Sequence, residues 1–224
     1  MRPPDAVEIV GTTTLRRCVR LLYRSLAIVS SALQTASPSI TVLLRDGTSV
    51  RMRPVTPADR DQLVRGFEDL SEAARYQRFF TPVARLSSTQ LDYLTDIDHV
   101  DHFAWGAESI DGAGIAIARY VRTGSDLAEA AFTITDNYQG RGLGWQLFQS
   151  LAMIAADHQL SRFEMTMLAD NSAMEHLARK AGAEFEPPTG TTVRAEVELK
   201  PALWSDLPLS TELRRLAASV GAAA

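Results

Sequence analysis

An apolar strand, a glycine-rich turn and a helix follow one another without a break between Thr133 and Ala155. The turn carries three glycines in a G-x-G-x-G pattern, at Gly140, Gly142 and Gly144, and the apolar residues after it recur at helical spacing. Glycines let a backbone bend sharply and approach a ligand closely, and the N–H groups that open a helix attract anions. This segment therefore predicts a phosphate-binding loop at the start of a helix.

Two common phosphate loops do not fit this spacing. The dinucleotide fingerprint G-x-G-x-x-G is absent, and no Gly-Lys-Ser/Thr sequence of a P-loop follows the glycines. A G-x-G-x-G turn is by itself also compatible with a tight turn that binds nothing.

Strand and helix patterns are mixed along the rest of the chain from Ile40 onward. Asp46-Gly47 is typical of a hairpin turn, and Thr56 followed by Pro57 is typical of a helix start. We expect strands at 41–45, 49–55, 102–108, 113–121, 127–135, 162–168 and 193–199, and helices at 57–70, 72–80, 87–95, 142–158, 172–181 and 204–218. The pattern predicts an α+β domain at residues 41–200, with a mainly antiparallel mixed sheet flanked by helices, and a C-terminal helix or tail at 201–224.

The first 40 residues differ from the rest in charge, with five arginines against Asp5 and Glu8. Apolar residues recur there every three or four positions, which predicts a basic amphipathic helical extension at residues 1–40. Packing on the main domain or on a partner is the reading we favour, and a translation start placed too early is an alternative. A membrane-surface helix or a secretory signal is the other alternative, although Arg24 interrupts the apolar stretch.

Composition excludes several classes of protein. The net charge is −4, from 23 basic and 27 acidic residues, so no overall positive field would attract nucleic acid. A single cysteine, Cys18, rules out an internal disulfide and a thiolate metal cluster, and it fits a reducing, cytoplasmic location. The histidines of Asp98-His99-Val100-Asp101-His102 do not have the spacing of a zinc site, so we expect a turn before a strand and no metal.

The loop Gln139-Gly140-Arg141-Gly142-Leu143-Gly144 resembles the Q/R-x-x-G-x-G/A signature of the GCN5-related N-acetyltransferases, the GNAT family. Three further segments resemble family landmarks in the expected order: the first strand and helix start in RMRPVTPAD (51–59), the fourth strand in AEAAFTITD (128–136), and the last helix in LADNSAMEHLARKAG (168–182). The resemblance covers residues 41–199.

A narrower resemblance links the chain to bacterial GNAT domains that acetylate protein lysines. It rests on LSEAARYQRFF (70–80), on DHVDHFA (98–104), and on an acid at the start of the fourth strand. In some of those enzymes a cyclic-nucleotide domain precedes the GNAT domain. Forty residues are too few for such a domain, so we expect no control by cyclic AMP.

The family resemblance implies where acetyl-CoA binds. Backbone amides of Gln139, Gly140, Arg141, Gly142, Leu143 and Gly144 would hold its pyrophosphate, and those of Phe132, Thr133 and Ile134 would hold the pantetheine arm and polarise the thioester. Asn171 resembles the family's cofactor-facing Asn, and an Asn before an apolar helix is also a good N-cap.

Glu129 is the candidate general base for acetyl transfer. Strand alternation puts it on one face with Ala131 and Thr133, where small side chains leave room for a substrate amine and partial burial would suit a base. Lysine-acetylating relatives place their base at the matching position. An exposed strand residue or an ion-pair partner is the structural alternative. Many family members carry a Tyr that protonates the leaving thiolate, where this chain has Ala178.

The sequence thus predicts an acetyl-CoA-dependent N-acyltransferase that moves an acetyl group directly to an amine, which we take to be a protein lysine. A small-amine N-acetyltransferase and a non-catalytic acyl-CoA-binding regulatory module stay open, as does a homodimer. Tyr76, Phe79, Phe80 and Trp105 are expected in the core or the cleft wall, and Arg75, Arg78 and Arg85 are candidates to meet an acidic partner surface.

Overall fold

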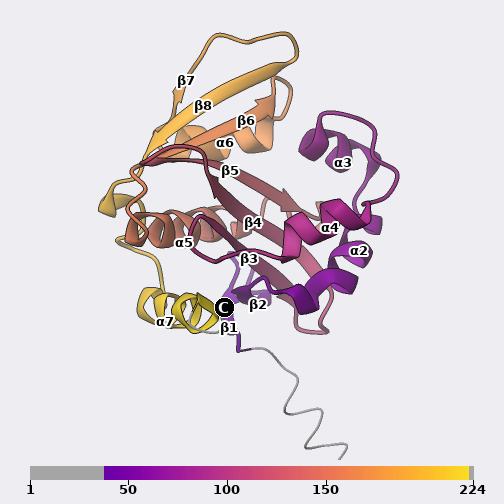
Figure 1. The fold of residues 1–224 in the computed structure, drawn as a ribbon, viewed down its shortest axis with the longest axis vertical. Coiled ribbons are helices and arrows are strands. Elements are labelled where there is room, and N and C mark those ends of the chain that lie inside the picture. Colours follow the sequence, from indigo (N-terminus) through magenta and orange to yellow (C-terminus); the bar gives the residue numbers. More distant parts are fainter. Residues whose placement is uncertain (1–37, 222–224) are drawn as a thin grey trace, which may run out of the picture. The chain divides into compact units, whose positions relative to one another are not determined.

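The computed structural model describes residues 38–221, and the helix predicted within residues 1–40 lies outside them. The described part is a mixed sheet with helices on both sides (Figure 1). Its eight strands are β1 (Ile40–Leu43), β2 (Ser49–Pro54), β3 (His102–Ser109), β4 (Gly114–Arg122), β5 (Leu127–Ile134), β6 (Arg162–Leu168), β7 (Glu184–Phe185) and β8 (Thr192–Glu198). Its helices are α2 (Arg60–Glu68), α3 (Glu72–Phe79), α4 (Ser88–Thr95), α5 (Leu143–Asp157), α6 (Ser172–Lys180) and α7 (Ser210–Gly221), with short 3-10 turns η1 (Pro57–Asp59), η2 (Asp136–Tyr138) and η3 (Pro201–Leu203).

The sheet has the strand order β1-β2-β3-β4-β5-β6-β8-β7. Every neighbouring pair is antiparallel except β5 and β6, which are parallel because α5 connects them as a crossover. The predicted α+β fold with a mainly antiparallel mixed sheet is thereby confirmed.

Side-chain alternation divides the sheet into two faces. On one face, Phe103, Trp105, Tyr120 and Phe163 are fully buried against α5 and α7. The other face is covered by α2, α3 and α4, as Figure 1 shows on the opposite side of the sheet. The main core therefore lies between the sheet and α5, whereas the face under α2–α4 holds a smaller set of apolar contacts.

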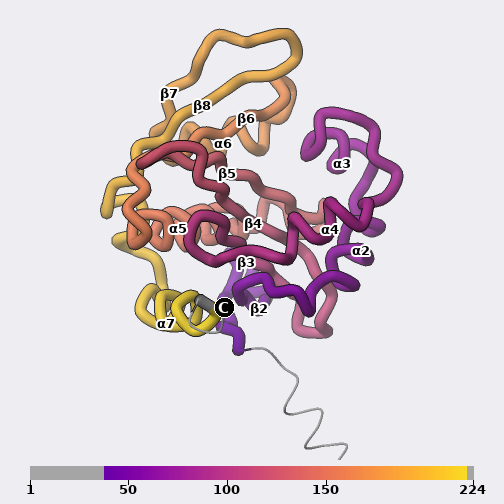
Figure 2. Tube along the Cα trace, viewed as in Figure 1, coloured from indigo at the N-terminus to yellow at the C-terminus, as the bar shows by residue number. Residues whose placement is uncertain are grey.

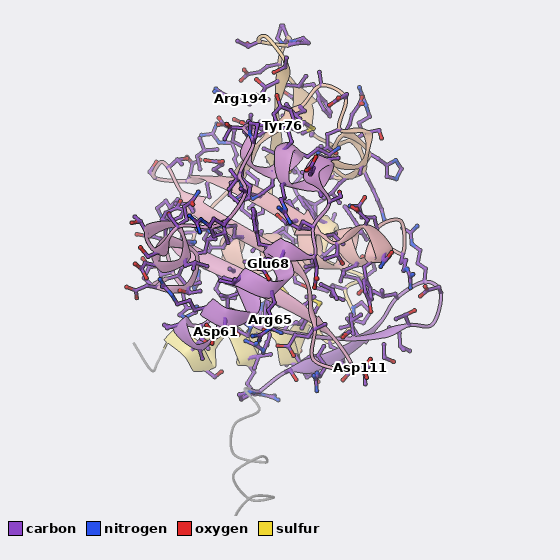
Figure 3. All side chains as sticks on the ribbon, turned by 90° about the vertical axis from the view of Figure 1, so that its right-hand side faces the viewer. Asp61, Arg65, Glu68, Tyr76, Asp111 and Arg194 are labelled. Carbon is purple, nitrogen blue, oxygen red and sulfur yellow. The ribbon has the colours of Figure 1, made fainter. Side chains whose placement is uncertain are left out.

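Helix α2 is amphipathic as its spacing predicts. Phe67 is buried toward the sheet side, whereas Asp61, Arg65 and Glu68 are exposed on the outer side of the helix (Figure 3). This arrangement fixes which face of the sheet α2 covers.

The C-terminal helix α7 lies close to the first strands of the sheet. Helix α7 packs against β2 and α5, and the tube in Figure 2 shows it beside the point where the described chain starts. Within residues 38–221, no helix is both long enough and apolar enough to cross a bilayer.

Most element bounds differ from the sequence predictions by no more than three residues, and two differences are larger. Strand β7 has only two residues, Glu184–Phe185, which is too short to give a periodic pattern. The C-terminal helix begins at Ser210 rather than at Trp204, because Pro208 and the turn at η3 come first.

Strands β5 and β6 separate soon after they begin. Their parallel pairing covers only three positions, Leu127–Glu129 with Arg162–Glu164. Beyond Glu129, β5 continues to pair with β4, and β6 continues to pair with β8. The edge of β5 that would face β6 is therefore open from Ala130 onward.

A buried ion network attaches the first helix to the sheet. Arg53 on β2 donates to Asp59 Oδ2 over 2.7 Å, to Glu108 Oε1 over 2.7 Å and to Gln62 Oε1 over 3.0 Å. Asp59 is 6% exposed and also accepts from the Thr56 N–H at 2.7 Å. These contacts hold η1 and α2 on β2 and β3.

Replacing Asp59 by Asn should destabilise the protein. The change leaves Arg53 with one carboxylate partner instead of two, and breaking a buried ion pair typically costs about 3 kcal/mol of unfolding free energy. Asp111→Asn, in the exposed turn between β3 and β4 (Figure 3), is the matched control and should cost less than about 0.5 kcal/mol. Urea unfolding of both variants measures the difference, and equal losses would contradict the role given to Asp59.

Candidate active site

A cleft of about 370 Å³ lies where β5 and β6 separate. Its walls come from β5, β6, α3, α6 and the loop that leads into α5. Of the side chains and loop positions predicted from the sequence, the cleft is lined by Glu129, Phe132, Thr133, Ile134, Gln139, Gly140, Gly142, Gly144 and Asn171. One cavity therefore brings together residues from both ends of β5 and from the starts of two helices.

The glycine loop has the geometry that requires glycine at two positions. Gly140 has a φ of 70° and Gly142 a φ of 92°, which are left-handed values that other residues adopt at a cost. Gly142 is the N-cap of α5, and a Cβ atom there would lie 3.0 Å from the Nε atom of Arg45. The first N–H groups of α5 have no partner within the helix, so with the helix dipole they can hold an anion.

Two predicted loop residues use their side chains elsewhere. Leu143 is fully buried in the core, and the Arg141 guanidinium pairs with Asp46 at 3.1 Å and lies over the Tyr138 ring at 5.2 Å. Only backbone groups of Arg141 and Leu143 are therefore left for a ligand. Gln139 stabilises the loop, since its Nε2 donates to the Ile134 carbonyl at 2.9 Å and to Asp136 at 3.1 Å.

Three cations in the cleft wall were not among the predicted ligand-binding residues. Arg45 comes from the β1–β2 turn, Arg78 from α3 and Lys180 from the end of α6. The Lys180 ammonium lies 4.0 Å from the centre of the Trp145 ring, and burial, together with the nearby charge of Arg45, lowers its pKa. No local pattern could reveal this group, because its members are more than 30 residues apart in the sequence.

Glu129 occupies the last paired position of β5 before the strands separate. Its side chain is exposed and lines the cleft, so the expectation of partial burial is wrong. The reason is that β6 moves away at this point and leaves nothing to cover the carboxylate. The predicted alternation of β5 is confirmed, since Ala128 and Ala130 are buried on the opposite face.

Asn171 caps α6. Its Oδ1 accepts from the Met174 N–H at 3.1 Å, the side chain is 6% exposed, and the residue also lines the cleft. The capping interpretation is thus confirmed, and cofactor contact stays a prediction. Ala178, about two turns further along α6, is fully buried and carries no acidic proton.

A second, smaller cavity of about 100 Å³ lies under α2, α3 and α4. It shares Arg78, Ala131 and Thr133 with the first cavity. Ala131 and Thr133 are the only β5 residues common to both walls, and their small side chains leave room for a chemical group at this boundary.

The turn before β3 is confirmed, and it holds a histidine against a buried arginine. Asp98 Oδ1 accepts from the backbone N–H groups of Val100, Asp101 and His102, each at 2.9 Å. The His102 ring contacts Arg119 on β4, and burial, followed by the charge of Arg119, lowers the pKa of His102 to about 4. Among residues 38–221, no three His, Cys, Asp or Glu side chains gather in the way a metal site requires.

The chain is similar in sequence and in fold to known acetyltransferases. The family model described as "Acetyltransferase (GNAT) domain" matches residues 49–184. The acetyltransferase Pat of Mycolicibacterium smegmatis is 36% identical over 177 residues, which are 78% of this chain and 52% of Pat, so this chain spans about half the length of that relative. An acetyltransferase of Pseudomonas aeruginosa is 31% identical over 156 residues, covering 67% of this chain and 84% of that protein. The solved GNAT domain of S. lividans PAT is 34% identical with a TM-score of 0.68, covering 72% of this chain and 97% of the domain.

Alanine substitutions at Gly140 and Gly142 should distinguish the cost of a left-handed backbone from the cost of a clash with a neighbouring side chain. Gly140→Ala adds a Cβ with nothing within 4 Å, so it should cost only the left-handed strain, about 1 kcal/mol of unfolding free energy. Gly142→Ala adds the same strain and displaces the Arg45 side chain, so it should cost about 2 kcal/mol. Urea unfolding measures both, and equal losses would show that Arg45 moves aside freely.

The stability of the protein should fall as the pH falls from 6.5 toward 4. His102 has an ordinary pKa of 6.5 when unfolded and about 4 when folded, so the unfolded state binds more protons in this range and is favoured by acid. Burial also lowers the pKa of His99 and His158, which adds to the slope.

His102→Gln should make this pH dependence shallower, whereas the same change at the exposed His176 should leave it as it is. Thermal melts from pH 4 to pH 7.5 provide the measurement. An unchanged slope in His102→Gln would contradict the assignment.

Proposed function

The chain belongs to the GNAT family of acetyltransferases, and on that basis we propose that it transfers the acetyl group of acetyl-CoA to an amine, with a protein lysine as the acceptor. The observation that carries this proposal is the single cleft that joins a glycine-capped helix start to the carboxylate of Glu129. Phosphate recognition and proton transfer are the two requirements of the reaction, and the cleft supplies a group for each.

The loop end of the cleft is suited to the diphosphate of acetyl-CoA. The unpaired N–H groups at the start of α5 donate there, and Gly140 and Gly142 let the backbone approach without side chains in the way. Arg45 and Lys180 in the same wall add positive charge. Backbone N–H groups on the open edge of β5, around Phe132–Ile134, are suited to hold the arm that leads to the thioester.

Glu129 is suited to accept the proton that the amine loses. In the transfer, the amine nitrogen forms a bond to the thioester carbonyl carbon, the carbon–sulfur bond breaks, and CoA leaves as a thiolate that takes up a proton. Because Ala178 has no proton to give, water or the substrate ammonium supplies it. The exposure of Glu129 lets a bulky acceptor reach the carboxylate.

A lysine side chain suits the wall next to Glu129. Phe80 and Ala74 line the cleft from the α3 side, and the exposed ring of Phe80 offers an apolar surface to the lysine stem. Tyr76, which we expected in the core or the cleft wall, is exposed and lines neither cavity. The narrow resemblance to lysine-acetylating GNAT domains supports the same acceptor, and the single cysteine fits action in the cytoplasm. A small amine is the close alternative.

A module that binds acyl-CoA without turnover is the second candidate function. The absence of a Tyr at Ala178 favours it, since no side chain there protonates the leaving thiolate. The two candidates differ in turnover and not in binding.

Calorimetric titration with acetyl-CoA tests the binding half of the proposal. We expect binding at least tenfold tighter than that of acetyl-pantetheine, which lacks the diphosphate and the nucleotide. Equal affinities would remove the loop from the proposal, and no binding at millimolar acetyl-CoA would overturn acyl transfer altogether.

Glu129→Gln tests the catalytic half. Turnover should fall about 100-fold or more, because the amide no longer accepts the proton, while the affinity for acetyl-CoA stays the same. Glu164→Gln, at the register partner on β6, is the matched control and should keep wild-type turnover. Unchanged turnover in Glu129→Gln would show that another group is the base.

A further inference from the structure

Two guanidinium groups stand at the boundary between the two cavities. Arg78 lines both of them from α3, and Arg119 lines the smaller one from β4, directly across from Ala131 in the sheet register. Glu129 lines the larger cavity together with Arg78, and its charge favours the charged form of both arginines. The pair therefore lies where the acyl group and the acceptor would meet.

Between residues 38 and 221, the partners that Arg119 contacts are neutral. It is 3% exposed, its Nη2 contacts the Nε2 atom of His102 and the Tyr93 carbonyl at 3.5 Å, and its guanidinium lies 4.6 Å from the centre of the Tyr93 ring. Its Nη1 atom is buried and has no hydrogen-bond partner within the described residues. One donor of a fixed guanidinium is thus left for an additional group.

Arg78 also lacks an acidic partner. It lies 5.3 Å from the centre of the Phe79 ring, and it makes no ion pair with any residue between 38 and 221. Burial lowers the pKa of both arginines, that of Arg119 to about 10. A guanidinium group stays protonated in proteins at neutral pH, so both side chains carry a positive charge.

Arg53 in the same cavity wall provides the contrast. Two carboxylates, Asp59 and Glu108, neutralise it within the fold. Arg53 thus has acidic partners within the fold, whereas no acid of the part of the chain that the structure describes lies within ion-pair distance of Arg78 or Arg119. A buried cation without a partner, such as Arg119, is costly, and the half-buried Arg78 adds a like charge that repels it.

We propose that Arg78 and Arg119 bind a carboxylate that a substrate carries a few bonds from the reacting group. This inference rests on the proposed acyl transfer and deepens it by naming a substrate class. A planar guanidinium matches a carboxylate in shape and charge, and both cations lie beside the small residues that separate the cavities.

The carboxylate has two sources with the same chemistry. It is either the far end of a dicarboxylic acyl group, such as succinyl, or the carboxylate of an amino-acid acceptor. In both, the amine nitrogen bonds to the thioester carbon, the carbon–sulfur bond breaks, the thiolate takes up a proton, and the carboxylate stays unchanged.

Calorimetry distinguishes the sources without requiring turnover. One arm compares succinyl-CoA with acetyl-CoA, and the other compares L-lysine with 1,5-diaminopentane on protein saturated with CoA. In at least one arm the carboxylate-bearing compound should bind about tenfold more tightly than the counterpart that lacks the carboxylate. Arg78→Gln and Arg119→Lys should reduce that ratio toward one, and Arg85→Gln, at an exposed position before α4, should preserve it.

The outcomes separate this inference from the proposed function. Ratios near one in both arms, or a preference that survives in both arginine variants, would overturn the carboxylate site while acetyl-CoA binding stands. Failure of acetyl-CoA to bind would overturn the proposed function itself, and the inference with it. Arg78 is half-buried, so its variant keeps the test valid if the buried Arg119 variant does not fold.

Discussion

The early separation of β5 from β6 is the constraint on which the rest of the structure depends. Three paired positions hold the two strands together, and each strand then follows its other neighbour. The separation forms the cleft and leaves one edge of β5 open. Glu129, at the last position of β5 that pairs with β6, is exposed in this cleft. The loop that begins α5 lies at the other end of the same strand, so β5 sets the spacing between the two halves of the site.

The two faces of the sheet are stabilised by different means. Aromatic and aliphatic side chains fill the face under α5, where burial of apolar surface dominates. The face under α2–α4 depends on charge, with Arg53 neutralised inside the fold and Arg78 and Arg119 left without acids. The face under α2–α4 is stabilised partly by ion pairs and contains a cavity, so it is less tightly packed than the face under α5. Looser packing suits the side of the sheet at which the acceptor would bind.

Local signals predicted the elements that position the site. Asp46-Gly47 gave the β1–β2 turn, the alternation of residues 127–134 gave the two faces of β5, and the glycines gave the start of α5 at Leu143, one residue from the expected position. Asn171 was predicted as a cap because an N-cap is a local hydrogen bond. Each of these features depends on residues within a few positions of one another.

Features that arise from tertiary structure could not be predicted in this way. The exposure of Glu129 depends on where a strand 35 residues away turns aside. Arg45, Arg78 and Lys180 come from three separate elements and line the same cleft. The side chain of Arg141 is held by an ion pair with Asp46, which lies in the distant β1–β2 turn. The two-residue β7 exists only because β8 offers it an edge.

The open edge of β5 has a further consequence for how the protein avoids misassembly. An unpaired row of N–H and C=O groups is normally a template for a strand from another molecule. Here residues of α3, α6 and the start of α5 line the cleft beside this row, and they narrow the access of another chain in extended conformation. A slender ligand with amide groups, such as the pantetheine arm in the proposed complex, can still enter and pair with the backbone. In that complex the co-substrate would take the place of the missing neighbour strand, so the sheet would be completed only while substrate is bound.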